Sequence, residues 1–162
     1  MLSLDEIKQR LAAHEGFRSK PYKCTSGKLT IGIGRNIEDN PFTEEELRLV
    51  DKDYMEKGIT KAQAFAILAR DVMQFDFELR EKIPFYANLD DERQYALLDM
   101  AFNMGIGNSK KGLLSFKNML RYLGTGFYKQ AAEECLNSKY GRELPTRAGR
   151  IANTIETGVF KW

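Results

Sequence analysis

Metal-binding side chains are scarce in this sequence, which has two cysteines and one histidine among 162 residues. Cys24 and Cys135 stand far apart and match no metal-ligand spacing, and His14 alone leaves too few ligands for a zinc site. We therefore expect no metal and no other cofactor. The same wide separation gives no support for a disulfide, and we expect Cys135 to be a buried free thiol.

Long apolar runs are missing as well. No stretch approaches the roughly 20 residues with which a helix spans a bilayer, so we expect no stable membrane insertion. At the N-terminus Leu4, Ile7 and Leu11 recur at helical spacing, which is typical of an amphipathic helix and not of a secretion signal. We expect a monomer that is made in the cytoplasm without a signal peptide.

The net charge of +2 is small but unevenly spread. Residues 1–109 carry 15 basic and 19 acidic side chains, whereas residues 110–162 carry 10 basic and 4 acidic ones. A surplus of this size is typical of a solvated face, and the alternative is attraction to a polyanion such as nucleic acid or a cell-wall polymer. Any anionic partner should meet the C-terminal part of the chain.

The order of sequence patterns predicts a single α+β domain over residues 1–162. A helix that ends near Gly16 precedes a β-hairpin, whose second strand is predicted over residues 28–34 after the turn Cys24–Gly27. Capping patterns at Thr43 and Thr60 predict a short helix and then a long one over about 60–80. Glycines separate the helices predicted after that, over about 91–104, 113–123, 126–136 and 146–156.

These patterns predict two lobes that share a helix. A mixed hairpin lobe covers about 13–60, a connecting helix about 60–82, and a helical lobe about 83–162, on which we expect helix 1–13 to pack. A cleft between two lobes is a common place for a ligand site.

Three side chains of the hairpin region could carry chemistry. Glu15 falls at the C-terminal end of the first predicted helix, where the helix dipole favours a protonated carboxyl, as a general acid requires. Cys24 and Thr30 lie on the two sides of the predicted turn, so the three groups can converge. A solvated glutamate at a helix end is the simpler alternative.

A set of short stretches occurs in order over nearly the whole chain. The stretches are His14–Arg18, Tyr22–Lys23, Thr30–Gly34, Ile59–Lys61, Asp71–Val72, Phe102–Gly105 and Pro145–Ala148. Together they resemble the phage-type lysozymes, the muramidase endolysins of glycoside hydrolase family 24. Glu15, Cys24 and Thr30 resemble the subset of this family that carries glutamate, cysteine and threonine at this spacing.

The resemblance implies hydrolysis of the β-1,4 bond between N-acetylmuramic acid and N-acetylglucosamine in peptidoglycan, with inversion, for bacterial cell-wall lysis. Glu15 would protonate the leaving oxygen as the general acid. Inversion needs a second group that holds a water on the opposite face of the sugar, where the family most often has aspartate and this chain has Cys24. Peptidoglycan, and no nucleic acid, would be the partner. A wall enzyme made in the cytoplasm implies an export route such as a phage holin or a secretion apparatus.

Cys24 has two possible roles in this reaction. It could orient or deprotonate the attacking water while Thr30 holds the water's second hydrogen bond, or it could act as a nucleophile that forms a sugar–sulfur intermediate. Only the thiolate is basic, so a lowered pKa matters, and Lys23 and Lys28 would lower the thiol pKa if they lie close.

Further residues receive supporting roles from the resemblance. Arg147 matches the arginine beside the catalytic acid, with a surface arginine as the alternative, and Tyr22 is a second supporting residue. Arg35 stands where the family usually has histidine, and we expect an ion pair between Arg35 and Asp71; two unrelated surface charges are the alternative.

Four more residues match substrate-binding positions of the family. Gly34 is the last residue of the predicted hairpin strand, and Phe102 and Asn103 fall where the family lines the far wall of the cleft. The Phe102 ring could pack on a sugar face, or it could be plain core. Lys139 lies where the family has a basic residue near the peptide stem.

Two other functions stay open. Cys24 and His14 could form the catalytic pair of a cysteine hydrolase, in which His14 is essential and Glu15 dispensable. A peptidoglycan-binding or phage structural module with the same fold would bind without cleaving.

Overall fold

The structure, a computed structural model, describes residues 2–162. These residues form two compact units. The N-terminal unit comprises residues 4–74, and the C-terminal unit comprises residues 75–162 together with residues 2 and 3. Helix α4 (Lys61–Lys82) contributes to both units, so the long predicted helix is present and runs slightly beyond its predicted end.

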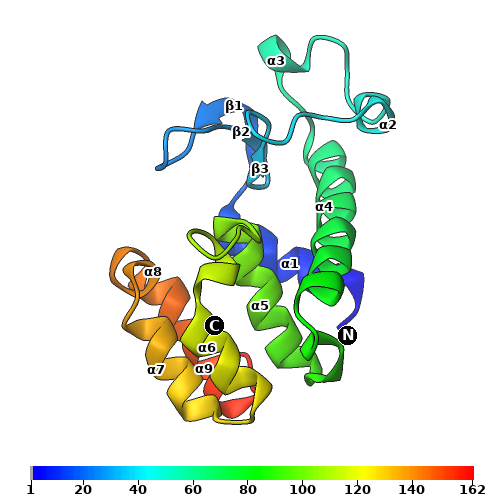
Figure 1. The fold of residues 1–162 in the computed structure, drawn as a ribbon. Coiled ribbons are helices and arrows are strands. Elements are labelled where there is room, and N and C mark those ends of the chain that lie inside the picture. The colour runs from blue at the N-terminus through cyan, green and yellow to red at the C-terminus, as the bar shows by residue number, and fades with distance from the viewer. Residues whose placement is uncertain (1) are drawn as a thin grey trace. The chain divides into compact units, whose positions relative to one another are not determined.

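The N-terminal unit combines a small sheet with helices (Figure 1). Its elements before α4 are α1 (Leu4–Glu15), β1 (Arg18–Lys23), β2 (Leu29–Gly32), β3 (Arg35–Asn36), α2 (Glu44–Leu47) and α3 (Tyr54–Lys57). Both predicted capping patterns are present, since Thr43 and Glu46 form a complete capping box and Thr60 and Gln63 exchange the same pair of bonds. The patterns therefore mark helix starts as predicted.

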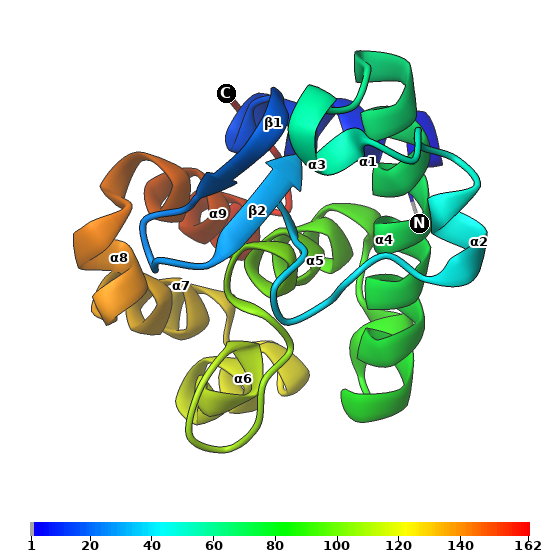
Figure 2. The same cartoon turned by 90° about the horizontal axis from the view of Figure 1, so that it is seen from above.

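The predicted hairpin is confirmed, and it is the first part of a three-stranded antiparallel sheet of order β1-β2-β3. Figure 2 shows β1 and β2 side by side, joined by the turn Cys24–Gly27. Within that turn the Gly27 amide donates to the Cys24 carbonyl at 2.8 Å. Pro21 lacks an amide hydrogen and is accommodated on β1, an edge strand.

One detail of the sheet differs from the sequence prediction. The second strand ends at Gly32 and not at Gly34, because Gly32 and Gly34 both adopt positive φ angles and turn the chain back into β3. As a result Ile31 pairs with Arg35 across the turn, and β2 becomes the central strand of the sheet.

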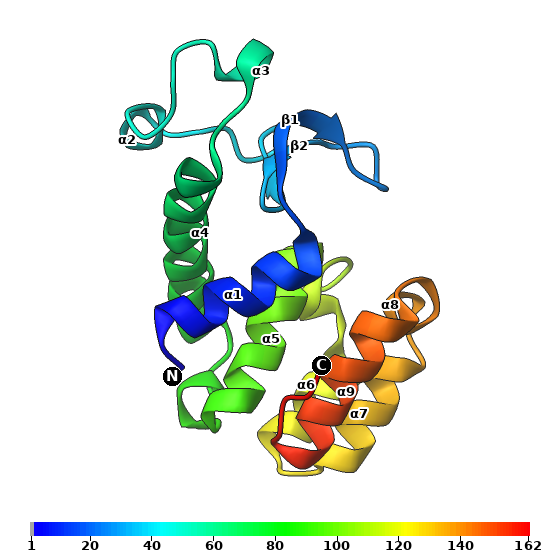
Figure 3. The ribbon, with the colours of Figure 1, turned by 180° about the vertical axis from the view of Figure 1, so that it is seen from behind.

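The C-terminal unit is helical, as predicted. Helix α5 (Asp91–Met104) has the predicted bounds, and α9 (Pro145–Thr157) lies beside α7 (Tyr128–Leu136) and α5 (Figure 3). The predicted helix 113–123 is divided at Phe116 into η2 (Leu113–Ser115) and α6 (Lys117–Gly124). Two short elements were not predicted, η1 (Tyr86–Asn88) and α8 (Lys139–Glu143). Cys135 is a fully buried free thiol, as expected.

Each unit has apolar side chains that are removed from water. In the N-terminal unit Ile31, Leu68 and Val72 are almost completely buried, and in the C-terminal unit Leu97, Ile151 and Ile155 are. Among the described helices, none combines the length and the apolar character needed to cross a bilayer. Within residues 2–162 no cluster of three or more histidine, cysteine, aspartate or glutamate side chains is arranged to hold a metal ion.

Candidate active site

Glu15 is the last residue of α1 and is half-buried. The helix ends there because Gly16 adopts a φ of 73° while its amide still donates to the Ala12 carbonyl at 2.8 Å. The Glu15 side chain lies against the backbone of Gly34, such that a methyl group on Gly34 would stand 2.9 Å from Oε2 and 3.0 Å from Cδ. The turn between β2 and β3 therefore forms one wall around the carboxyl group.

Tyr22 and Thr30 face each other across the sheet, as directly paired residues of β1 and β2. Thr30 is 4 % exposed, and its hydroxyl donates to the Lys28 carbonyl at 3.0 Å. Partial burial and the negative charge of Glu15 raise the pKa of Tyr22, with a smaller upward contribution from Cys24 and an opposing one from Arg18. The Tyr22 phenol is thus within electrostatic reach of both Glu15 and Cys24.

Cys24 is half-buried at the start of the hairpin turn. Burial acts to raise the pKa of its thiol, but hydrogen bonds outweigh this effect, and the pKa lies below its ordinary value. The larger contributions come from the Ser26 hydroxyl at 3.0 Å from Sγ and from the backbone at Lys28 and Ser26, and a smaller one comes from the Thr30 hydroxyl, whose single hydrogen can point either to Sγ or to the Lys28 carbonyl. Donors that favour a thiolate therefore surround the sulfur.

The largest causes of this lowered pKa are hydrogen bonds, and the ammonium groups of Lys23 and Lys28 are not among them. Lys28 Nζ instead lies 3.3 Å from Asp39 and 3.4 Å from Glu38. Its charge is directed to those carboxylates, and only its backbone takes part in the environment of the thiol.

Arg35, the residue after Gly34, is 5 % exposed and makes the predicted ion pair with Asp71, at 2.6 Å between Nη1 and Oδ1. The structure adds a partner that the sequence did not reveal, because Glu46 accepts from both Nη1 at 2.8 Å and Nη2 at 2.9 Å. Nε and Nη2 also donate to the carbonyls of Asn40 and Pro41. We refer to Arg35, Glu46 and Asp71 as the buried ion cluster.

The two carboxylates of the cluster differ in pKa. Burial acts to raise the pKa of Glu46, but the Arg35 guanidinium and the Thr43 amide outweigh it and lower the pKa to about 2. Burial raises the pKa of Asp71 to about 7, opposed by Arg35 and supported by the negative charge of Glu46. Two carboxylates share one guanidinium, and Glu46 takes the larger part of its charge. Arg70 lies 3.6 Å from Glu46 as a second, more exposed cation.

Arg147 lies in the first turn of α9, and its Nε donates to Asp99 Oδ1 at 2.9 Å. Asp99 is completely buried in the middle of α5 and also accepts from the Tyr95 hydroxyl at 2.9 Å. The guanidinium of Arg147 is therefore held within the C-terminal unit by a buried carboxylate. A helix-surface arginine, the alternative reading, does not fit a side chain that is only 11 % exposed.

The remaining predicted residues of the C-terminal unit differ in exposure. Phe102 is 8 % exposed and its ring centroid lies 5.5 Å from that of Phe75, which favours the core alternative over a ring that faces sugar. Asn103 is half-buried near the end of α5. Lys139 begins α8 and is exposed, with Glu143 at 3.7 Å.

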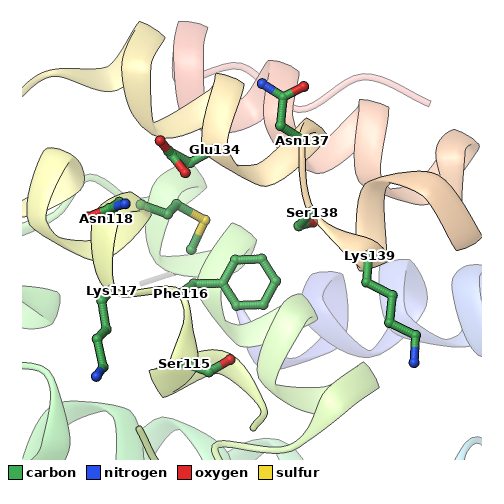
Figure 4. Close-up of a pocket in the computed structure, with 9 residues that line it drawn as sticks. Ser115, Phe116, Lys117, Asn118, Glu134, Asn137, Ser138 and Lys139 are labelled. Atoms are coloured by element: carbon green, nitrogen blue, oxygen red, sulfur yellow. The ribbon is translucent and has the colours of Figure 1, made fainter. Parts of the chain in front are cut away.

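Lys139 also lines a pocket of the C-terminal unit of about 520 Å³. Figure 4 shows the ring of Phe116 at the centre of the pocket lining, with Ser115 and Ser138 near it. The other lining residues are Lys117, Asn118, Met119, Glu134 and Asn137. The pocket is mixed in character, with an aromatic ring, amides and charges of both signs, and could accept a polar, partly charged group.

Three functional candidates escaped the sequence reasoning, namely Glu46, Asp99 and Tyr95. A signal for Asp99 exists in the sequence, because it is the one charged residue in the run Ala96–Ala101 of a predicted helix, and a buried charge needs a partner. Glu46 was assigned only to a capping box, and its second role with Arg35 depends on tertiary contact. Tyr95 has no comparable signal.

Comparison with known proteins gives these observations a family context. Residues 12–150 match the family model described as phage lysozyme. The chain is 30% identical to "Probable T4-type lysozyme 1" of Dictyostelium discoideum over 96% of each chain, and 29% identical to "Probable T4-type lysozyme 2" of the same organism over 98% of each. It is also 30% identical to the pre-baseplate central spike protein Gp5 of Enterobacteria phage T4, where 93% of this chain matches 27% of that protein.

Proposed function

The chain belongs to the phage lysozyme family and is thus a glycoside hydrolase, and we propose that it hydrolyses the β-1,4 bond between N-acetylmuramic acid and N-acetylglucosamine in peptidoglycan with inversion. The observation that carries the proposal is the grouping of Glu15, Tyr22, Cys24 and Thr30 in one compact unit. The relatives include amoebal proteins and a phage spike protein, so the proposal concerns the reaction on the cell wall and not one biological setting.

Glu15 acts as the general acid in this proposal. Its carboxyl group is half-buried at a helix C-terminus, where the helix dipole disfavours the charged form. The backbone of Gly34 packs against one side of this group. A carboxyl held in this way can protonate the glycosidic oxygen as the bond to the leaving sugar breaks.

Cys24 acts on the attacking water. The donors around Sγ favour the thiolate, which can accept a proton from a water or orient it, and the adjacent Thr30 hydroxyl can hold the same water. Protonation of the leaving oxygen by Glu15 and removal of a proton from water by Cys24 balance the reaction. Arg147, held by Asp99, is a supporting residue in this scheme.

Release of reducing ends from purified sacculi tests the assignment. We expect Glu15→Gln and Cys24→Ala to reduce release by about 100-fold or more, because each removes a proton-transfer group. His14→Gln is the matched control, since His14 precedes Glu15 on the same helix but has no role in the proposal. Release of amino groups in place of reducing ends, retained in Glu15→Gln and lost in His14→Gln, would favour a cysteine hydrolase, and sacculus binding without any release would favour a binding module.

The stereochemistry needs a separate measurement. Proton NMR of a soluble glycan substrate during the first minutes of reaction distinguishes the two anomers of the new reducing end. Inversion gives the α anomer first. Early appearance of the β anomer would indicate retention and would support a nucleophilic Cys24 with a sugar–sulfur intermediate.

A further inference from the structure

We propose that the buried ion cluster of Arg35, Glu46 and Asp71 is a positioning device for the Glu15 carboxyl group and acts through Gly34. The three residues would be positioning residues and not catalytic ones, because none of them reaches the reacting atoms. This inference rests on the proposed function, since it assigns them a task in the same site.

The turn between β2 and β3 contacts the proposed acid. Gly34 lies so close to Glu15 that even a methyl group would stand about 3 Å from three atoms of its side chain, namely Oε2, Cδ and Cγ. Any displacement of the backbone at Gly34 therefore changes the space available to the carboxyl group. The position of this turn therefore limits where the Glu15 carboxyl group can lie.

The guanidinium of Arg35 anchors this turn. Arg35 follows Gly34 directly, and five hydrogen bonds join its guanidinium to two carboxylates and two backbone carbonyls. All three nitrogens take part, so the guanidinium has one orientation. A backbone shift at Gly34 would have to break several of these bonds in a site that water scarcely reaches.

The groups that bind the Arg35 guanidinium come from three different segments. Asp71 lies on α4, Glu46 lies on α2, and the two carbonyls belong to the loop between β3 and α2. Glu46 is itself fixed, because its carboxylate also accepts from the Thr43 amide at 3.1 Å in the capping box. These contacts fix the position of the turn relative to α4, to α2 and to the loop between β3 and α2.

Stability alone is a weak reason for such a cluster. A buried ion pair is often no more stabilising than apolar side chains of similar volume, because taking charges out of water is costly. Unlike an apolar core, the cluster fixes the orientation of the Arg35 side chain, because the planar guanidinium sets both the distance and the angle of its hydrogen bonds. A general acid requires surroundings that hold its carboxyl group in one orientation.

Steady-state kinetics on soluble peptidoglycan chains tests the proposal with Arg35→Lys, Glu46→Gln and Asp71→Asn. We expect kcat to fall about 10- to 100-fold, as small misplacements of reacting groups do, with KM changed less than about twofold. Each variant is assayed well below its own melting temperature. Arg93→Lys is the matched control, because Arg93 also donates to two backbone carbonyls and a carboxylate, but in the C-terminal unit; its kcat should stay at the wild-type value.

Wild-type kcat in the folded cluster variants would overturn the proposal. If none of the three folds, the triple variant Arg35→Met, Glu46→Leu, Asp71→Leu replaces the cluster by apolar side chains, which buried ion clusters can tolerate, and the same kcat criterion applies to it; a triple variant that also failed to fold would assign the cluster to stability and likewise overturn the proposal. Glu15→Gln is measured in parallel. Activity in Glu15→Gln contradicts the proposed function itself, whereas an inactive Glu15→Gln with unaffected cluster variants contradicts only this inference.

Discussion

The carboxylate of Glu15 packs against Gly34, with room for a hydrogen atom and none for a methyl group. The two residues belong to different elements, since one ends α1 and the other lies in the turn between β2 and β3. The positive φ of Gly34 brings the backbone to this place. A backbone position that lacks a side chain thus shapes the surroundings of the proposed acid.

Gly34→Ala should therefore lower kcat by more than its loss of stability explains. A left-handed φ costs an L-residue about 1–2 kcal/mol, and the added methyl group also displaces the Glu15 carboxyl group. We expect kcat to fall at least about 10-fold. Gly126→Ala is the matched control, because Gly126 has a φ of 84° and open space around it; it should lose similar stability and keep its kcat. Equal kcat values in the two variants would contradict the contact.

The lowered pKa of Cys24 predicts selective alkylation. At neutral pH iodoacetamide should modify Cys24 in the folded protein, and Ser26→Ala should slow this reaction, because it removes the hydroxyl at 3.0 Å from Sγ that favours the thiolate. The midpoint of the rate against pH should move upward in Ser26→Ala. An unchanged midpoint would show that the Ser26 hydroxyl does not favour the thiolate.

Cys135 provides an internal control for the same experiment. It is fully buried, and burial raises its pKa to about 12. Mass spectrometry should therefore find one modified thiol in the folded chain and two after unfolding in urea. Modification of both thiols under native conditions would indicate that the C-terminal unit opens.

The raised pKa of Asp71 should make the free energy of unfolding depend on pH. Its pKa of about 7 in the folded protein lies above the ordinary carboxyl value. Between these two values the folded state therefore binds a proton that the unfolded state does not. The stability that this group contributes is complete below about pH 4 and is lost as pH rises through about 7. Urea unfolding between these values should show a steeper decline for the wild type than for Asp71→Asn.

Glu46 does not obscure this window, because its pKa of about 2 makes its contribution disappear only at lower pH. Asp39→Asn is the control, since Asp39 is an exposed carboxylate paired with Lys28. It should leave the slope of the wild type unchanged. Parallel curves for the wild type and Asp71→Asn would contradict the raised pKa.

Asp99 should be the most sensitive carboxylate of the C-terminal unit. Asp99→Ala leaves the Arg147 guanidinium and the Tyr95 hydroxyl without their shared buried acceptor, and removing one partner of a buried pair costs about 3–5 kcal/mol. Glu143→Ala removes an exposed partner of Lys139 and should change stability little. Urea unfolding compares the two, and similar effects would argue against a structural role for Asp99.

Local patterns predicted much of the fold. The capping boxes at Thr43 and Thr60, the turn at Cys24–Gly27 and the bounds of α5 all depend on neighbours within a few residues. The family resemblance led to the pair of Arg35 and Asp71, which are far apart in sequence. Each of these features follows from interactions within a few residues or from a known family motif.

Tertiary contact determined what the sequence did not reveal. The strand over residues 28–34 looks continuous in sequence, yet the positive φ angles at Gly32 and Gly34 end it at Gly32 and turn the chain into β3. Glu46 serves both its own helix and a distant guanidinium, and only the second role needs the folded chain. The thiol of Cys24 illustrates a different limit, because Ser26 and the backbone at Lys28 are close to it in sequence, yet only the folded turn brings them within hydrogen-bond distance of Sγ.

The most direct test of the account is the identity of the sugar at each new reducing end. Purified peptidoglycan is digested, the ends are reduced with borohydride, and the hydrolysate is examined for muramicitol and glucosaminitol. We predict muramicitol alone from the wild type and neither product from Glu15→Gln. Glucosaminitol from the wild type, or muramicitol from a Glu15→Gln protein at the wild-type rate, would contradict a muramidase in which Glu15 is the acid.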